Sequence, residues 1–259
     1  MPDPILLVVA HADDEVIGAG AWLARLPDDQ KPRVTIAYIT DSAPENPWFA
    51  REAGFATRDE YAAARRSERD AALQIAGISP GQCRDFGFGD QQSFRNLVEI
   101  TSRISKLVDE LRPSVILTHP YEGGHPDHDS AAFAVRQAAT AGNVQVREFT
   151  SYHAAPQGLE TGRFLPFPGS PEHVLTLTEA ERALKRSMFA CHRTQARVLA
   201  WFDIAEERFR PAPDYDFTRP PHPGTLHYES LDWGITGEMW RAHAAEALEL
   251  LAAGCTSCP

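Results

Sequence analysis

The sequence lacks most of the features that would place a protein in a membrane, outside the cell or on nucleic acid. No apolar run approaches the ~18 residues of a membrane-spanning helix. Only 25 Lys and Arg stand against 36 Asp and Glu, and the net charge of −11 argues against nucleic acid or an anionic membrane as partner. The N-terminal apolar run has no basic segment before it, so we expect no signal peptide.

Cysteine is also scarce, and its pattern excludes a disulfide framework. The four cysteines are Cys83, Cys191, Cys255 and Cys258, of which only the last two form a C-x-x-C pair. A zinc knuckle needs a second pair, so we expect this one to belong to a frayed tail. Reduced, unpaired cysteines favour a cytoplasmic location.

Short apolar runs alternate with amphipathic helical patterns over the first 150 residues. Strands are predicted at 5–10, 33–40, 114–118 and 144–152, and helices at 15–26, 57–76, 95–111 and 129–141. Asp14 is placed to cap the first of these helices. Such alternation predicts an α/β fold, a Rossmann-like, mostly parallel sheet with helices on both faces.

The rest of the chain predicts an elaboration of that fold. Residues 41–57 read as a long irregular loop, and proline clusters flank a helix at 179–201 before a last helix at 237–253. We therefore expect one domain over 1–259, with a metal-binding core at 1–152 and a C-terminal elaboration at 153–259 that shapes the substrate pocket.

Two polar clusters follow predicted strands directly. His11, Asp13 and Asp14 come after the first strand, and the segment 118–129, with His125 and His128, comes after the strand at 114–118. Ligands of open α/β sheets bind at the carboxyl ends of the strands, so the two clusters are expected to face one another. Histidines with one carboxylate are the ligands of a catalytic zinc ion. His11 and Asp14 fit one turn, and His128 can add a third ligand.

Each cluster alone has an ordinary explanation. A His-x-x-Asp pattern is typical of a helix cap beside a surface histidine, and only its coincidence with the second cluster favours a metal. The GlyAlaGly at 18–20 lies inside a predicted helix and lacks a third glycine, so a dinucleotide site is not favoured.

The two clusters resemble the motifs of a known family. AlaHisAlaAspAspGlu at 10–15 and GlyHisProAspHis at 124–128 are similar to the paired motifs of the PIG-L/LmbE-like zinc-dependent de-N-acetylases. That family has a Rossmann-like fold and removes acetyl groups from N-acetylated amino sugars and their conjugates. The resemblance covers roughly residues 1–150.

The resemblance implies a role for each motif position. It implies zinc ligands at His11, Asp14 and His128, a general base at Asp13, an oxyanion-supporting and protonated His125, and substrate-hydroxyl contacts at Arg65 and Asp90. Ala12 stands where the family has proline, and we expect a looser turn there.

Together these observations predict a zinc-dependent hydrolase that releases acetate and a free amine from an N-acetylglucosamine-type amino sugar or its conjugate. One alternative is a non-catalytic, Rossmann-like ligand-binding module with a structural metal, which would not need Asp13 or His125. Another is a phosphoester hydrolase, which would favour two ions, more carboxylates and a more basic pocket. Pocket walls are expected from 41–57 and 153–235, with Trp48, Phe49, His192 and Trp233 as candidates.

Overall fold

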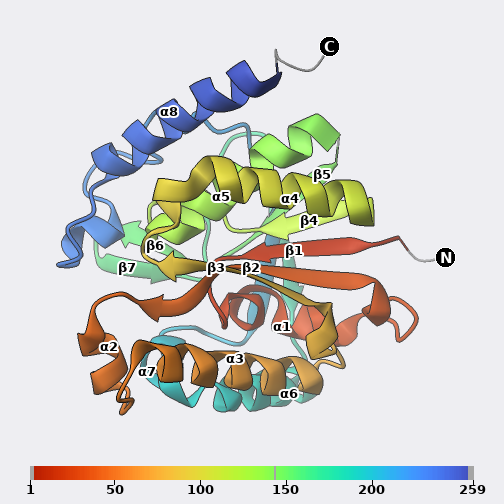
Figure 1. The fold of residues 1–259 in the computed structure, drawn as a ribbon. Coiled ribbons are helices and arrows are strands. Elements are labelled where there is room, and N and C mark those ends of the chain that lie inside the picture. Colours follow the sequence, from red (N-terminus) through yellow and green to blue (C-terminus); the bar gives the residue numbers. More distant parts are fainter. Residues whose placement is uncertain (1–2, 143, 256–259) are drawn as a thin grey trace.

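The computed structural model of the chain describes residues 3–142 and 144–255 and is built around one mixed sheet (Figure 1). The spatial order of its seven strands is β3-β2-β1-β4-β5-β9-β8. Their bounds are β1 Ile5–Val9, β2 Val34–Pro44, β3 Cys83–Asp90, β4 Val115–Thr118, β5 Gln145–Phe149, β8 His173–Thr176 and β9 Glu206–Pro211. The first five strands in this order are parallel, and β9 and β8 add an antiparallel edge. The predicted α/β fold with a mostly parallel sheet is confirmed.

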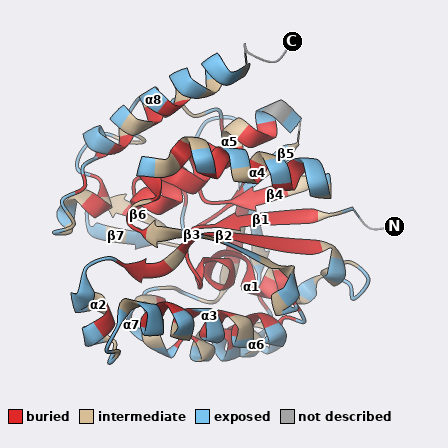
Figure 2. Ribbon diagram, in the orientation of Figure 1, coloured by how far each residue is buried: buried red, intermediate tan, exposed pale blue. Residues whose placement is uncertain are grey.

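Strand β1 lies in the middle of the sheet and is buried on both faces (Figure 2). Its side chains alternate between two hydrophobic cores: Leu6 and Val8 pack into one, and Ile5, Leu7 and Val9 into the other. Burial on both sides explains why the strand reads as an unbroken apolar run.

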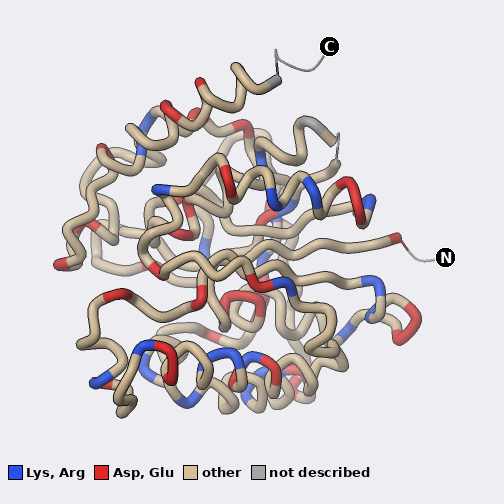
Figure 3. The backbone as a smooth tube through the Cα atoms, viewed as in Figure 1, with Lys and Arg blue, Asp and Glu red and all other residues tan. Residues whose placement is uncertain are grey.

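Helices cover both faces of the sheet (Figure 1). Helices α4 (Leu97–Leu111), α5 (Pro126–Gly142) and α8 (Gly237–Cys255) form the layer on the Leu6 face. Helices α1 (Asp14–Arg25), α3 (Arg58–Ile75) and α6 (Glu179–Cys191) form the layer on the Leu7 face. The charged residues gather on the outer helices and loops (Figure 3).

Two helices begin with the capping boxes that the sequence predicts. At the start of α3, the hydroxyl of Thr57 accepts from the Glu60 amide, and the Glu60 carboxylate accepts from the Thr57 amide. Thr178 and Glu181 make the same pair of bonds at the start of α6. Helix α1, by contrast, has Asp13 rather than Asp14 at its N-cap position, and no capping bond is made by the Asp13 side chain.

Several predicted boundaries were wrong. The expected loop at 41–57 is partly regular, because β2 continues to Pro44 and a short helix α2 (Pro47–Glu52) follows. Helix α5 begins at Pro126 rather than 129, which places His128 in its first turn. The expected helix at 179–201 ends at Cys191 and resumes only as the short α7 (Ala196–Leu199). The strand expected at 144–152 is divided between β5 and β6 (Tyr152–Ala155), which pairs with β7 (Gly158–Thr161) in a separate hairpin.

The C-terminal part is packed onto the loop and helix that follow β4. The indole Nε1 of Trp240 in α8 donates to the carbonyl of Pro126 at 3.0 Å, at the start of α5. Gly123, at φ 68°, lies under Leu226 so closely that a Cβ there would be 2.7 Å from a Leu226 methyl group. This part of the chain therefore fixes the segment that carries His125 and His128.

None of the helices within 3–142 and 144–255 has the length and apolar character needed to cross a membrane. Of the C-x-x-C tail, only the backbone of Cys255 belongs to the described residues.

Candidate functional site

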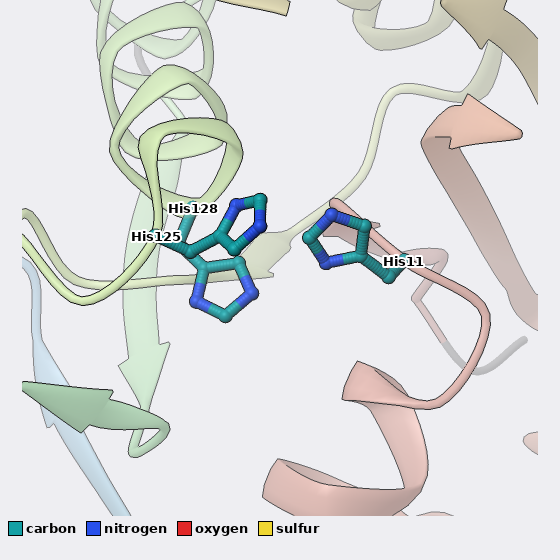
Figure 4. A group of neighbouring side chains, drawn as sticks. All are labelled: His11, His125 and His128. Atoms are coloured by element: carbon teal, nitrogen blue, oxygen red, sulfur yellow. The ribbon is translucent and has the colours of Figure 1, made fainter. Parts of the chain in front are cut away.

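The two polar clusters meet at the carboxyl ends of β1 and β4. His11 follows β1, while His125 and His128 come from the start of α5, and the three rings point toward one another (Figure 4). One nitrogen from each ring lies within 4.8 Å of the others, and all three side chains are buried. This arrangement can hold a metal ion.

Asp14 links the two sides of this cluster. Its Oδ1 lies 3.2 Å from Nε2 of His128, and its Oδ2 lies 3.4 Å from Nδ1 of His11. Ligand atoms around a tetrahedral zinc ion, at bond lengths of about 2.0–2.2 Å, are about 3.3–3.6 Å apart, and each of the two separations is close to that range, but they involve different oxygens of Asp14. The described groups that include His128 and whose ligand atoms all lie within 4.8 Å of one another are His11 with His125 and His128, and Asp14 with His119 and His128. The buried Nε2 of His128 makes no hydrogen bond to any described residue, so its lone pair can be donated to a cation.

The second nitrogen of His11 is held by Asp127. The Oδ2 of Asp127 lies 3.2 Å from His11 Nε2. The same carboxylate accepts from the amides of Gln91 at 2.6 Å and Ser93 at 3.1 Å, and from the Ser93 hydroxyl at 2.5 Å. With its oxygens so engaged, Asp127 is fixed in place and holds the His11 ring through Nε2.

The site is electrostatically prepared for a cation. Burial disfavours protonation of His11, but the carboxylates of Asp90, Asp127 and Asp14 outweigh it and raise the His11 pKa well above its usual value. Burial likewise disfavours the charged form of Asp14, yet the neighbouring histidines, His128 foremost, hold its pKa well below the usual range. Negative charge is thus concentrated beside the unpartnered nitrogen of His128.

Asp13 contacts α3 through Arg65. Its Oδ2 accepts from Nη2 of Arg65 at 3.0 Å, and burial raises the Asp13 pKa although Arg65 opposes the rise. Arg65 also donates to the carbonyl of Ser42 at 2.6 Å. In this structure Arg65, expected to contact substrate hydroxyls, therefore holds the predicted base.

The turn at Ala12 is anchored by a backbone hydrogen bond. The Ala12 amide donates to the hydroxyl of Ser42 at 2.8 Å, a bond that a proline at this position would lack. Ser42 has φ 62° and also binds Arg65 through its carbonyl. One residue thus connects the turn carrying Asp13 to the arginine that contacts it.

His125 is held with Nε2 as its donor. Its Nδ1 accepts from the Asp127 amide at 3.1 Å, which leaves the ring proton on Nε2. Burial and the neighbouring His11 lower the His125 pKa well below its usual value. Nε2 carries a proton in either protonation state, and the protonated form expected from the sequence stays a prediction.

Asp90 lies between two of the histidines. Its Oδ1 is 3.3 Å from Nε2 of His11 and 3.8 Å from Nε2 of His125, and its Oδ2 is 3.9 Å from Nη1 of Arg65. Asp90 ends strand β3, which the sequence did not predict, so its position in the site was supported only by the motif.

The four expected pocket residues have different surroundings. Trp233 packs its ring against His125 at a centroid distance of 5.0 Å, and Trp48 is half exposed on α2. Phe49 packs against a small separate core around Tyr61, and His192 is fully buried at the end of α6.

Three further residues complete the surroundings of the metal site and were missed by sequence reasoning. His119 stacks on His128, Ser151 has its hydroxyl 3.3 Å from Nδ1 of His128, and Asp127 orients His11. Asp127 lies inside the second motif, so its sequence position was a usable signal. Ser151 lies beyond the motifs, and its role appears only in the folded chain.

Comparison with known proteins places the chain in a family. The sequence model of the PIG-L family, described as GlcNAc-PI de-N-acetylase, matches residues 6–139. A probable N-acetyl-α-D-glucosaminyl L-malate deacetylase 2 of Bacillus cereus is 33% identical over 141 residues, which cover 52% of this chain and 60% of that protein. A 1D-myo-inositol 2-acetamido-2-deoxy-α-D-glucopyranoside deacetylase 2 of Catenulispora acidiphila is 34% identical, covering 55% of this chain and 53% of that protein. The match thus spans little more than half the length of these relatives.

Solved structures agree on the fold over a larger part of the chain. A deacetylase of teicoplanin biosynthesis superposes with a TM-score of 0.65 at 21% identity, covering 82% of this chain and 99% of that one. The A40926 pseudoaglycone deacetylase gives a TM-score of 0.64 at 23% identity, covering 83% and 98%. The fold therefore extends beyond the segment that the family model matches. Because that segment covers both motifs and more than half of this chain, the protein belongs to the PIG-L family.

Proposed function

We propose that the protein is a zinc-dependent N-deacetylase that releases acetate from an N-acetylglucosamine-type amino sugar or its conjugate. One observation carries the proposal: in a chain of the PIG-L family, Asp14 lies 3.2 Å from Nε2 of His128, and the His11 and His125 rings lie close to His128. A second carboxylate, Asp13, is held nearby by Arg65. The relatives named above are deacetylases of glucosaminyl malate and glucosaminyl inositol compounds, which supports the substrate class.

In this proposal His11, Asp14 and His128 hold the metal ion. A bound zinc ion would polarise the amide carbonyl and lower the pKa of a water molecule to about 7. Asp127 keeps Nε2 of His11 engaged, so that Nδ1, which lies 3.4 Å from Oδ2 of Asp14, is the nitrogen that would hold the ion.

Asp13 and His125 carry the proton transfer and the charge stabilisation. Asp13 accepts a proton from the attacking water and returns it to the departing amine. Arg65 keeps the Asp13 carboxylate oriented, and burial keeps its basicity from falling. The Nε2–H group of His125 would donate a hydrogen bond to the oxyanion that forms on the carbonyl oxygen and keep its proton, and a preorganised donor of this kind lowers the barrier. Asp90 and Arg65 are the candidates for contacts to sugar hydroxyls.

The test is acetate release by zinc-reconstituted protein from a panel of N-acetylglucosamine conjugates, together with elemental analysis. His11→Ala and His128→Ala should lose most of the zinc and the activity while keeping the far-ultraviolet circular dichroism of the wild type. His173→Ala, on the exposed edge strand β8, is the matched control and should keep both. Zinc binding without acetate release from any conjugate would favour the non-catalytic binding module, and full zinc in both site variants would contradict the ligand assignment.

A further inference from the structure

His119 is a buried histidine at the site that belongs to neither motif. It follows β4 directly and is fully buried. Its ring lies parallel to that of His128, at a centroid distance of 3.9 Å and an interplanar angle of 8°. Phe149 contacts the same ring edge-on at 5.0 Å. The imidazole of His119 is therefore held between His128 and the end of β5.

The polar edge of His119 faces Asp14. Its Nε2 lies 3.2 Å from Oδ2 of Asp14 and 3.2 Å from the amide nitrogen of Ala10. The Ala10 amide donates to this nitrogen, and the contact with Asp14 is a hydrogen bond in the state that carries a proton on Nε2. His119 thus touches two of the three proposed ligands, one through its face and one through its edge.

His119 cannot itself share an ion with His128, although its nitrogen lies close enough to belong to the same cluster. A histidine binds a metal along the lone pair in the plane of its ring, at about 2.0–2.1 Å. Two parallel rings in van der Waals contact have planes that do not meet, so an ion in the plane of His128 lies well outside the plane of His119. The stacking geometry excludes His119 as a ligand of that ion.

We propose that His119 is a positioning residue that prepares Asp14 and His128 to bind the metal; this inference rests on the ligand assignment of the proposed function. Stacking fixes the tilt of the His128 ring, while the Ser151 hydroxyl at Nδ1 fixes its rotation in the plane. Oδ2 of Asp14 is held by the His11 amide at 2.6 Å and by Nε2 of His119 at 3.2 Å. This leaves Oδ1 of Asp14 directed at Nε2 of His128. Without His119, both ligands would have to be ordered when the metal binds.

The inference is tested by zinc affinity in competition with a chromogenic chelator. His119→Phe keeps a flat ring for stacking and removes the contact to Asp14, whereas His119→Gln keeps a polar atom and removes the ring. Each should weaken zinc binding by about 10–100-fold, the usual effect of losing a residue that orients a metal ligand. The absorption spectrum of the cobalt-substituted protein should also change, because altered ligand angles alter the visible bands.

Matched changes at His243, a half-buried histidine of α8 that contacts Phe94, are the control and should leave zinc affinity unchanged. All titrations are made at a temperature where circular dichroism shows each metal-free variant fully folded; a variant that does not reach this state is replaced by His119→Asn. Wild-type affinity and an unchanged cobalt spectrum in the folded variants would overturn the positioning role. Failure of the wild-type protein to bind zinc would instead contradict the proposed function itself.

Discussion

A buried ion pair between helix α6 and strand β9, packed against the backbone of α1, gives a prediction that tests the structure away from the candidate site. Nζ of Lys185 donates to Oε1 of Glu207 at 2.7 Å and to the carbonyl of Ile17 at 2.8 Å. Both charged side chains are almost fully excluded from solvent, at 1% and 0% exposure. The Glu207 carboxylate also accepts from the amides of Ala21 and Trp22. The pair therefore connects α1, α6 and β9 inside the protein.

Replacing Lys185 by methionine leaves the Glu207 carboxylate buried without a counter-charge. Breaking a buried pair in this way costs about 3–5 kcal/mol. With an unfolding entropy of about 2.1 cal/mol/K per residue, a chain of this length should lose about 6–9 °C in melting temperature. The double variant Lys185→Met/Glu207→Gln should be more stable than Lys185→Met alone, because it removes the uncompensated charge while an amide oxygen can still accept from α1.

The same two helices provide the matched control. Arg25 of α1 and Glu181 of α6 form a pair at 2.7 Å near the surface, where Arg25→Met should cost no more than about 1 kcal/mol. Thermal and urea unfolding followed by circular dichroism give the comparison. If Lys185→Met were as stable as Arg25→Met, the proposed energetic role of the buried Lys185–Glu207 pair would be wrong. A double variant less stable than Lys185→Met would lead to the same conclusion.

Three further results are expected. Asp13→Asn should lower turnover in the acetate-release assay by about 10²–10⁴-fold with zinc content unchanged, whereas Asp14→Asn should lose both; equal zinc loss would contradict the division between base and ligand. Burial raises the pKa of the Glu122 carboxyl group to about 8, although Arg210 opposes the rise. Between about pH 4.5 and 8 the folded state therefore keeps a proton on Glu122 that the unfolded state releases. The free energy of unfolding should fall as the pH rises through this range. Glu122→Gln should flatten that decline in urea unfolding, and an unaltered slope would exclude Glu122 as its source. Removing part of 45–55 should change preference among N-acetylglucosamine conjugates more than zinc content, and an unchanged preference would leave this segment a purely structural role.

The elements that sequence reasoning found are those with strong local signals. Strand β1 is a continuous apolar run, and α3 opens with a capping box, so neither depends on distant contacts to be recognised. The same holds for His11, Asp14 and His128, because the motifs stand directly after apolar runs and parallel strands bring their ends to one edge.

The elements that were missed depend on distant partners. Strand β9 reads GluGluArgPheArgPro, a charged sequence that looks like an exposed loop. Inside the protein, Arg210 is paired with Glu148 and Glu122, and Glu207 is paired with Lys185. These partners, which lie far away in the sequence, offset the cost of burying charged side chains of β9. Strand β3 carries two glycines and sits at the sheet edge, which weakens its signal.

Some contacts of the candidate site could not be predicted from the sequence for the same reason. The role of Asp127 toward His11, and the stacking of His119 on His128, are distances between side chains that no spacing in the sequence encodes. The engagement of Arg65 with Asp13 belongs to the same class, because it depends on how α3 crosses the end of β1.

The place of β9 in the sheet also affects how the chain is made. Strand β9 pairs with β5, and yet some 60 residues separate the two in the sequence. At a synthesis rate of about 5–20 residues per second, the edge of β5 waits several seconds on the ribosome before its neighbour emerges. During that interval an unpaired strand edge and the buried face of α1 are open to other chains. The nascent protein should therefore aggregate most readily when synthesis pauses between β5 and β9.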